Sequence, residues 1–222
     1  MLPRVLEPEA MDTPEEACDY DAMDHSEVNA RFVADFLRAH GPCRGGVLLD
    51  VGTGPARIPI ALGRADPDAR VIAVDLAEAM LALARRNVEE AGLSDRVLCE
   101  RSDAKALPFL DEHFEAVVSN SIVHHIPDPA PALAEMVRVL APGGTLFVRD
   151  LARPVDRDEV SRLVATYAGV ESESARGLFE ASLNAALTLK EMQEFARALR
   201  LPPEGVALTS DRHWTWTWHR PT

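Results

Sequence analysis

Residues 48–61 read LLDVGTGPARIPIA and predict a strand, a glycine-containing turn and an amphipathic helix, in that order. The apolar run at residues 47–51 is typical of a strand buried in a parallel sheet. Gly52 and Gly54 permit a tight turn after it, and the apolar positions that follow recur at helical spacing. Backbone without a Cβ, at a helix N-terminus with unpaired N–H groups, lets a nucleotide-like ligand approach closely. We therefore expect a ligand-binding loop here.

Two features of this loop favour a nucleoside over a dinucleotide. A dinucleotide site needs the pattern Gly-x-Gly-x-x-Gly to seat a pyrophosphate, and Arg57 occupies the position of its third glycine. An acid, Asp50, instead precedes the first glycine by two residues. The loop therefore fits a phosphate-free nucleoside ligand better.

The segment D-V-G-T-G-P-A at residues 50–56 resembles motif I of the class I S-adenosylmethionine-dependent methyltransferases. The family's acidic-x-Gly-x-Gly-x-Gly loop cradles the methionine part of the cofactor, and Ala56 replaces its third glycine here. The resemblance implies that S-adenosylmethionine is the cofactor. It assigns Asp50, Gly52, Thr53 and Gly54 to the cofactor site.

A second strand is predicted at residues 70–75, and it ends in Asp75. Asp75 follows Asp50 by 25 residues, close to the interval of ~20 residues at which a strand-end carboxylate meets a ribose in doubly wound sheets. A charged acceptor there can bind both vicinal hydroxyls. In the resembled family the residues just past this acid flank the adenine and the ribose, which adds Leu76 and Met80 to the predicted cofactor site.

Four more residues complete the predicted cofactor site. Asp103 and Ala104 follow a third predicted strand, and with the L-P-F sequence after them they resemble the family segment in which the acid approaches the adenine amino group. An exposed Asp in a loop is otherwise a common turn former. Tyr20 can cover the methionine end, or can be a half-buried packing residue instead. Asn120 ends the fourth predicted strand, at residues 114–120.

The substrate side is predicted from the segment SIVHHIPDP, which follows the fourth strand, and from the end of a fifth strand at residues 145–151. Ligands of open α/β sheets bind beyond the carboxyl ends of the strands, and His124, His125 and Asp150 lie there. We expect one histidine, with a slight preference for His124, to remove a proton from the nucleophile while Asp150 orients it or the substrate. Adjacent side chains point apart, so we expect no metal ion between the two histidines.

The order of the elements predicts an α/β fold with a doubly wound, mostly parallel sheet. A C-terminal antiparallel hairpin, in which Trp214, Trp216 and Trp218 share one face, would complete the seven-stranded Rossmann-like sheet of the resembled family. The small-molecule branch of this family has a strand, two histidines, a helix, a P-G-G sequence and another strand in that order. Residues 114–151 resemble this order, with A-P-G-G at residues 141–144 expected to end the helix.

The domain organisation is predicted from composition and helical patterning. Residues 1–25, rich in Pro, Asp and Glu near the start, are expected to form an N-terminal arm, and residues 26–222 a single methyltransferase domain. A helical insertion at residues 153–187 is expected to act as a lid. Thr188 with Glu191 predicts a capping box at the start of the next helix.

Composition limits the partners. The net charge of −13 argues against a nucleic-acid partner, and no apolar run is long enough to span a bilayer. Three cysteines without CxxC spacing predict neither a disulfide framework nor a zinc knuckle. We therefore expect a cytoplasmic protein with a small-molecule substrate and no nucleic-acid or membrane partner, and the sequence leaves its oligomeric state open.

Two alternatives to a methyltransferase can be weighed on the sequence. A short-chain dehydrogenase needs a Tyr followed by Lys four residues on, but the only tyrosines, Tyr20 and Tyr167, are followed at that spacing by Asp24 and Glu171. A non-catalytic sensor of the cofactor, or an enzyme that transfers another group from it, stays open.

Overall fold

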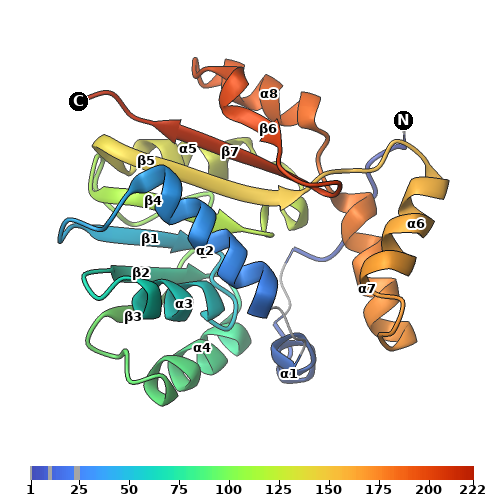
Figure 1. Cartoon of the computed structure of the whole chain (residues 1–222), viewed down its shortest axis with the longest axis horizontal. Coiled ribbons are helices and arrows are strands. Elements are labelled where there is room, and N and C mark those ends of the chain that lie inside the picture. Colours follow the sequence, from blue (N-terminus) through green and yellow to red (C-terminus); the bar gives the residue numbers. More distant parts are fainter. Residues whose placement is uncertain (1, 10–11, 23–25) are drawn as a thin grey trace. The chain divides into compact units, whose positions relative to one another are not determined.

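The computed structural model describes residues 2–9, 12–22 and 26–222, which form two compact units (Figure 1). The glycine-loop unit comprises the described residues of 10–120 together with residues 130–148 and 217–222. The histidine unit comprises residues 2–9, 121–129 and 149–216.

The seven strands form one sheet in the order β3-β2-β1-β4-β5-β7-β6. In the glycine-loop unit β1 pairs in parallel with both β2 and β4, and β2 pairs in parallel with β3. The hairpin β6–β7 is antiparallel, with Val206 opposite Trp216 and Leu208 opposite Trp214. The strands are β1 (Val47–Val51), β2 (Arg70–Asp75), β3 (Val97–Arg101), β4 (Phe114–Asn120), β5 (Leu140–Leu151), β6 (Val206–Leu208) and β7 (His213–His219). This arrangement confirms the predicted doubly wound, mostly parallel sheet with an antiparallel end.

In the glycine-loop unit helices connect β1 to β2, β2 to β3 and β4 to β5, as crossovers between parallel strands usually do. Figure 1 shows α2 and α3 in front of the sheet and α5 behind it, so both faces of this unit's strands are covered. The helices of this unit are α1 (Pro14–Ala22), α2 (Ser26–His40), α3 (Arg57–Ala65), α4 (Glu78–Glu90) and α5 (Ala130–Arg138).

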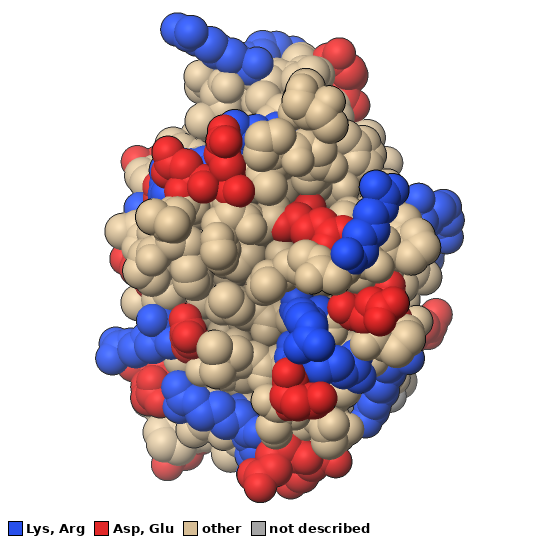
Figure 2. Space-filling view, turned by 90° about the vertical axis from the view of Figure 1, so that its left-hand side faces the viewer, with Lys and Arg blue, Asp and Glu red and all other residues tan. Residues whose placement is uncertain are grey.

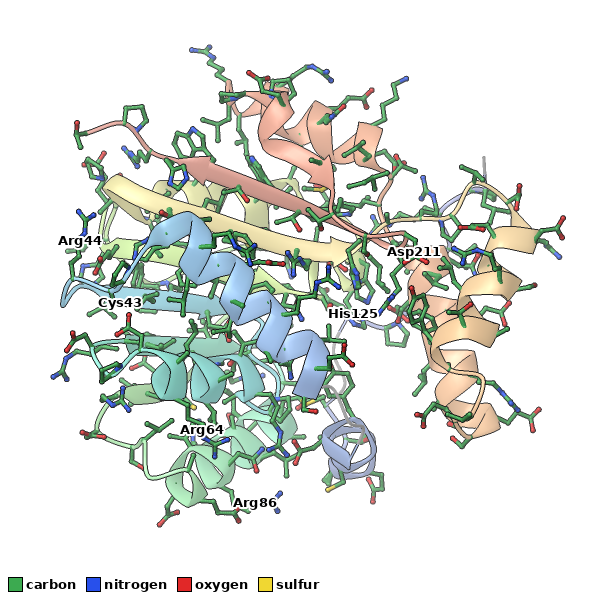
Figure 3. All side chains as sticks on the ribbon, viewed as in Figure 1. Cys43, Arg44, Arg64, Arg86, His125 and Asp211 are labelled. Atoms are coloured by element: carbon green, nitrogen blue, oxygen red, sulfur yellow. The ribbon has the colours of Figure 1, made fainter. Side chains whose placement is uncertain are left out.

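The core of the glycine-loop unit lies between α2, α3, α4 and the strands. Phe32 and Phe36 of α2 are fully buried and meet Phe147 edge to face, with ring centroids 5.2 and 5.8 Å apart. Such contacts add to the roughly 1.5–3 kcal/mol that burial of each large apolar side chain contributes. Cys43, labelled in Figure 3, is buried beside Asp66, and burial and this carboxylate raise the pKa of its thiol to about 12.

The histidine unit is mainly helical, and side-chain caps set its helix starts. Asp156 accepts from the backbone N–H of Glu159, and Ser172 caps the next helix in the same way. A cluster of Leu151, Leu163 and Leu183 with their neighbours holds these helices together. The elements are η1 (Val123–His125), α6 (Arg157–Tyr167), α7 (Glu173–Ala185), α8 (Leu189–Ala198) and η2 (Pro203–Gly205).

The structure corrects the predicted start of the fifth strand. Helix α5 ends at Arg138, and β5 already begins at Leu140 rather than at residue 145. The A-P-G-G sequence at residues 141–144 therefore lies inside the strand, where Gly143 has a φ of 76°. Glycine at this positive φ avoids the steric cost that another residue would meet.

The N-terminal residues contain more order than composition predicted. Helix α1 occupies residues that we expected in a loose arm, and its Asp21 accepts from Arg57 at 2.9 Å. Residues 2–9 are extended and belong to the histidine unit, where Val5 N–H donates to Asn184 O at 3.0 Å. The predicted arm boundary at residue 25 lies outside the described residues. Within the described ranges, no helix is both long and apolar enough to cross a membrane.

Candidate functional site

The loop after β1 has a backbone that depends on small residues. Gly52, Gly54 and Ala56 all have left-handed φ values, of 74°, 52° and 61°. Left-handed backbone is readily adopted by glycine and costs roughly 1–2 kcal/mol for another L-residue. The backbone N–H groups of Gly52 and Thr53 donate to Val74 O at 2.8 and 2.9 Å, which ties the loop to β2. The loop therefore presents backbone without bulky side chains beside the end of β2.

Asp75 joins this loop directly. One carboxylate oxygen accepts from Gly54 N–H at 2.8 Å and the other from Ala77 N–H at 3.0 Å. Burial raises the pKa of Asp75, and these backbone donors oppose that rise. Ser102 N–H in turn donates to the backbone O of Asp75 at 2.9 Å, so the ends of β2 and β3 are joined as well.

Asp103 lies in the turn after β3. Its Oδ1 accepts from Lys105 N–H at 2.9 Å and lies 3.1 Å from Lys105 Nζ. Burial works against the charged form, but the contacts with Lys105 outweigh it and lower the pKa of Asp103. Asp103 therefore has the turn-forming role and keeps an ionised carboxylate. Its contact with an adenine amino group stays a prediction.

Three buried polar atoms of this region have no hydrogen-bond partner among the described residues, namely Asp50 Oδ2, Thr53 Oγ1 and Ser102 Oγ. Asp50 is 1% exposed, and burial raises its pKa to about 7 although the Thr53 hydroxyl opposes the rise. Buried polar groups are normally hydrogen-bonded. These atoms at the ends of β1 and β3 therefore fit a polar ligand that supplies donors to them, as an amino-acid and nucleoside cofactor would.

Tyr20 packs beside the loop. Its Cε1 lies 4.0 Å from the position that a Cβ on Gly54 would take, so a larger residue there would contact the ring. Tyr20 is half-buried and packs with Met80 and Leu83 in a small apolar cluster. This is the packing role, and it places an aromatic ring next to the glycine loop. The other predicted cofactor residues, Leu76, Ala104 and Asn120, are half-buried at strand ends or in loops.

In the histidine unit, His124 and Asp150 form a buried pair. His124 Nδ1 lies 2.5 Å from Asp150 Oδ1, and the His124 backbone N–H donates to Asp150 Oδ2 at 3.1 Å. Burial alone would lower the pKa of His124, but Asp150 and Glu7 together raise it above its ordinary value. Burial would raise the pKa of Asp150, and the contact with His124 lowers it instead. Asp150 therefore lies where it can orient the imidazole of His124, and the catalytic role of the two residues stays a prediction.

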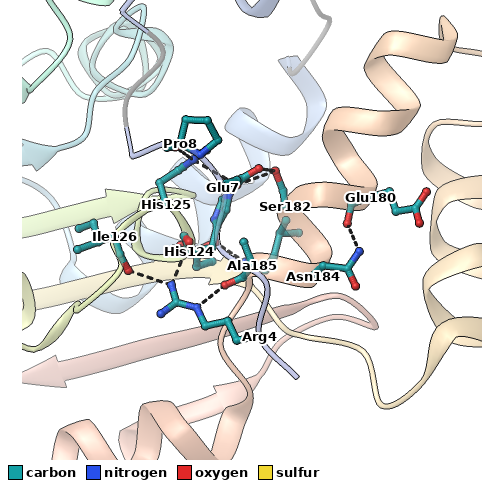
Figure 4. A network of polar contacts seen from close by, with 12 residues as sticks. Arg4, Glu7, Pro8, His124, His125, Ile126, Glu180, Ser182, Asn184 and Ala185 are labelled. Atoms are coloured by element: carbon teal, nitrogen blue, oxygen red, sulfur yellow. Dashed lines mark hydrogen bonds and ion pairs between the residues drawn. The ribbon is translucent and has the colours of Figure 1, made fainter. Parts of the chain in front are cut away.

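Glu7 is a third member of this group that the sequence did not indicate. Its Oε1 lies 3.3 Å from His124 Nε2 and 3.2 Å from His125 Nδ1 (Figure 4). Ser182 Oγ donates to Glu7 Oε1 at 3.2 Å. Glu7 lies in a segment that composition assigned to a loose arm, and no periodicity or motif marks it. Only a motif search that paired acids with distant histidines could have suggested it.

Arg4 holds this segment in place. Its guanidinium donates to the backbone O atoms of His124, Ile126 and Ala185 at 3.0, 2.9 and 2.7 Å (Figure 4). Five N–H donors in a rigid fork make arginine suited to binding several carbonyls at once. Arg4 therefore fixes Glu7 close to the two histidines.

The geometry of the histidines differs from what the sequence suggested. We expected adjacent imidazoles to point apart, but their ring centroids are 4.2 Å apart in η1 and both rings contact Glu7 Oε1. Adjacent side chains of a 3-10 helix lie about 120° apart, less than in a strand, where they point to opposite faces, so two tilted rings can reach one carboxylate. His125 is also near Pro8 O, at 3.3 Å from Nδ1. Burial and the neighbouring His124 lower the pKa of His125 to about 4.

Comparison with known proteins finds a methyltransferase domain within the chain. Residues 49–148 match the model of a methyltransferase domain. A demethylmenaquinone methyltransferase of Thermus thermophilus is 42% identical over 107 residues, which are 48% of this chain and 48% of that protein. A 27-O-demethylrifamycin SV methyltransferase of Amycolatopsis mediterranei is 31% identical over 176 residues, 78% of this chain and 61% of that protein. The chain thus spans about half to three fifths of the length of these relatives.

A solved structure extends the comparison to nearly the whole chain. A SAM-dependent methyltransferase from Aquifex aeolicus superposes with a TM-score of 0.65 at 19% identity, covering 92% of this chain and 97% of that one. This likeness shows a shared fold, and the glycine loop and Asp75 lie within the residues that match the domain model. Residues 49–148 therefore form a methyltransferase domain, and the chain has the fold of a solved SAM-dependent methyltransferase.

Proposed function

We propose that this chain transfers a methyl group from S-adenosylmethionine to an O, N, S or C nucleophile of a small molecule. The observation that carries the proposal is the carboxylate of Asp75, held by Gly54 N–H and Ala77 N–H beside a loop with left-handed backbone. The names of the relatives, a demethylmenaquinone and a rifamycin methyltransferase, support a small-molecule substrate. When bound, the cofactor supplies an electrophilic methyl group on a sulfonium.

The glycine-loop unit would hold the cofactor. Each oxygen of Asp75 accepts one backbone hydrogen bond and keeps capacity for a second, which two ribose hydroxyls can supply. Asp50 would take a hydrogen bond from the methionine part, which would satisfy its Oδ2. The full proposed set is Tyr20, Asp50, Gly52, Thr53, Gly54, Asp75, Leu76, Met80, Asp103, Ala104 and Asn120.

The histidine unit would serve the substrate. His124 donates from Nδ1 to Asp150, which leaves Nε2 as the atom that accepts a proton from the nucleophile. Asp150 fixes the ring orientation and stabilises the imidazolium that forms. His125 contributes a second imidazole next to His124. Residues 153–187, which carry α6 and α7, would act as the lid of a single methyltransferase domain that excludes water during the transfer.

The partner class follows from charge. Affinity for nucleic acid depends on clustered Lys and Arg, whereas on the face drawn in Figure 2 blue and red side chains are interspersed among the described residues. The net charge of −13 points the same way. The three cysteines are free, which suits the reducing cytoplasm that we propose for the protein.

Single replacements of His124, His125 and Asp150 by Asn test the role of the histidine unit. Turnover and S-adenosylhomocysteine affinity are measured side by side, with His219→Asn on β7 as the control. We expect at least one of the three variants to lose turnover by 10²–10⁴-fold, the usual share of general acid–base catalysis, at wild-type cofactor affinity. Wild-type turnover in all three would refute the catalytic assignment.

The alternative function, a cofactor sensor, makes a different prediction. Labelled S-adenosylmethionine incubated with a panel of quinone, polyketide and amine metabolites would yield S-adenosylhomocysteine only if the chain is an enzyme. The panel includes the nucleophiles that the relatives named above accept. If the chain binds the cofactor but forms no S-adenosylhomocysteine with any of them, the sensor is favoured.

A further inference from the structure

Three potential metal ligands converge in the histidine unit, from two segments far apart in the sequence. Glu7 comes from the extended residues 2–9, and His124 and His125 come from η1. One ligand atom from each residue lies within 4.8 Å of the other two. Two imidazoles and one carboxylate form the ligand set of many catalytic zinc sites.

Two of the separations within this group match the edge of a tetrahedral zinc site. Glu7 Oε1 lies 3.3 Å from His124 Nε2 and 3.2 Å from His125 Nδ1. Ligands about 2.0–2.1 Å from a tetrahedral zinc ion are separated by about 3.3 Å. A charge-assisted N–H···O hydrogen bond is shorter, at about 2.7–2.9 Å. The separations therefore leave room for an ion between the three atoms.

The contacts behind the ligands support the same assignment. His124 donates from Nδ1 to Asp150 at 2.5 Å, so its Nε2 is the ring atom that faces Glu7 and that binds an ion once it has lost its proton. A carboxylate that holds the second nitrogen of a ligating histidine is the usual outer shell of a zinc site. Ser182 Oγ likewise bonds the Glu7 carboxylate, at 3.2 Å from Oε1. Both ligands thus have partners that fix their orientation.

The site is enclosed by protein. The side chains of His124, Glu7 and His125 are 4%, 9% and 18% exposed. Arg4 anchors the segment that carries Glu7 by binding backbone O atoms on both sides of the cluster (Figure 4). A ligand set that is held in place before the ion arrives loses little conformational entropy on binding.

From these contacts we propose that Glu7, His124 and His125 bind one divalent transition-metal ion, with Zn²⁺ as the ion that fits the ligand set. The fourth tetrahedral position is left to water or to an oxygen of a ligand. Binding ties residues 2–9 to η1 through the ion. Because the ion occupies Nε2 of His124, this atom can accept a proton from the nucleophile only in the metal-free protein. The inference concerns binding of the ion and does not depend on methyl transfer.

Calorimetric titration of the metal-free full chain with Zn²⁺ tests the proposal, with Co²⁺ absorption as a second readout of tetrahedral coordination. We expect one Zn²⁺ per chain, and binding at least 100-fold weaker in Glu7→Gln and in His125→Asn. Glu15→Gln and His219→Asn are matched controls outside the cluster, and they should bind as the wild type does. Asp150→Asn should weaken binding by about 10–100-fold, the usual effect of losing the carboxylate behind a ligating histidine.

Three results would overturn the proposal: no stoichiometric Zn²⁺ binding by the wild type, equal affinity in the Glu7→Gln and His125→Asn variants, or a Co²⁺ spectrum of octahedral type only. The first would mean that protons bridge the three side chains instead. S-adenosylhomocysteine affinity measured on the same samples separates this inference from the proposed function. Zinc binding without any cofactor binding would contradict only the latter.

Discussion

Asp50 is the residue whose chemistry depends most on its surroundings. It is 1% exposed, and burial raises the pKa of its carboxyl to about 7. In the proposed cofactor site the ionised form of Asp50 attracts the cationic cofactor, so we expect binding of S-adenosylmethionine to be coupled to loss of a proton. A group with a pKa of about 7 goes from roughly one tenth to one half ionised between pH 6 and pH 7.

The affinity for S-adenosylmethionine should therefore rise roughly fivefold from pH 6 to pH 7, and this pH dependence should vanish in Asp50→Asn. Calorimetry at closely spaced pH values measures this dependence. The amino group of the cofactor stays protonated below pH 7, so it does not contribute to the change. An affinity that is flat over this range in the wild type, or that rises equally in the variant, would rule out Asp50 as the titrating group.

Three residues illustrate which features could be predicted from the sequence and which could not. The position of Ala56 was recognisable as a replaced glycine, but its left-handed φ of 61° could be known only from the structure. Asp75 was predictable because an apolar strand that ends in an acid is a local pattern. Glu7 was not, because its role depends on a contact between segments more than a hundred residues apart, which no local pattern encodes.

At the scale of elements, caps were the most predictable feature. The capping box at α8 is present: Thr188 Oγ1 accepts from Glu191 N–H at 3.2 Å, and Glu191 Oε2 accepts from Thr188 N–H at 2.7 Å. The hairpin was equally clear, with Trp214 and Trp216 fully buried on its packed face. Its turn is also tied to α6, since Asp211, labelled in Figure 3, accepts from the Tyr167 hydroxyl at 2.9 Å.

Thr188→Ala should lower the free energy of unfolding by about 1 kcal/mol, because α8 loses one side-chain acceptor at its N-terminus. Urea denaturation followed by circular dichroism measures it. Lys190→Ala on the same helix is the control, since the Lys190 side chain is 79% exposed and lies at a position without a cap. An equal effect of both changes would show that the box contributes nothing beyond helix propensity.

Element boundaries were less predictable than element types. The A-P-G-G sequence looked like a break between helix and strand, yet β5 runs through it. Proline and glycine discourage regular structure locally, but pairing with neighbouring strands can override that preference. Helix α1 was missed for a related reason: its sequence is mostly polar. It is held by the packing of Ala17 and Tyr20 in a small apolar cluster and by ion pairs such as Arg57 to Asp21 at 2.7 Å.

At the scale of the whole molecule, the alternation of strands and helices determined the fold class, because parallel strands need helical crossovers. The sequence could not show that residues 2–9 belong with residues 121–129 and 149–216, since that grouping is a matter of tertiary contacts. The cofactor site was therefore predicted from local sequence motifs. The substrate site was predicted only from residues at strand ends, and this prediction did not include the carboxylate of Glu7.

We propose that the glycine-loop unit binds S-adenosylmethionine through Asp75, and calorimetric titration of wild type and Asp75→Ala with S-adenosylhomocysteine measures this contribution. Loss of a charged acceptor should cost about 1.5–3 kcal/mol, or roughly ten- to a hundredfold in affinity. Asp95→Ala, an exposed acid of the same unit, should bind as the wild type does. Unchanged affinity in a folded Asp75→Ala variant, or tighter binding of NADH than of S-adenosylhomocysteine by the wild type, would contradict the account.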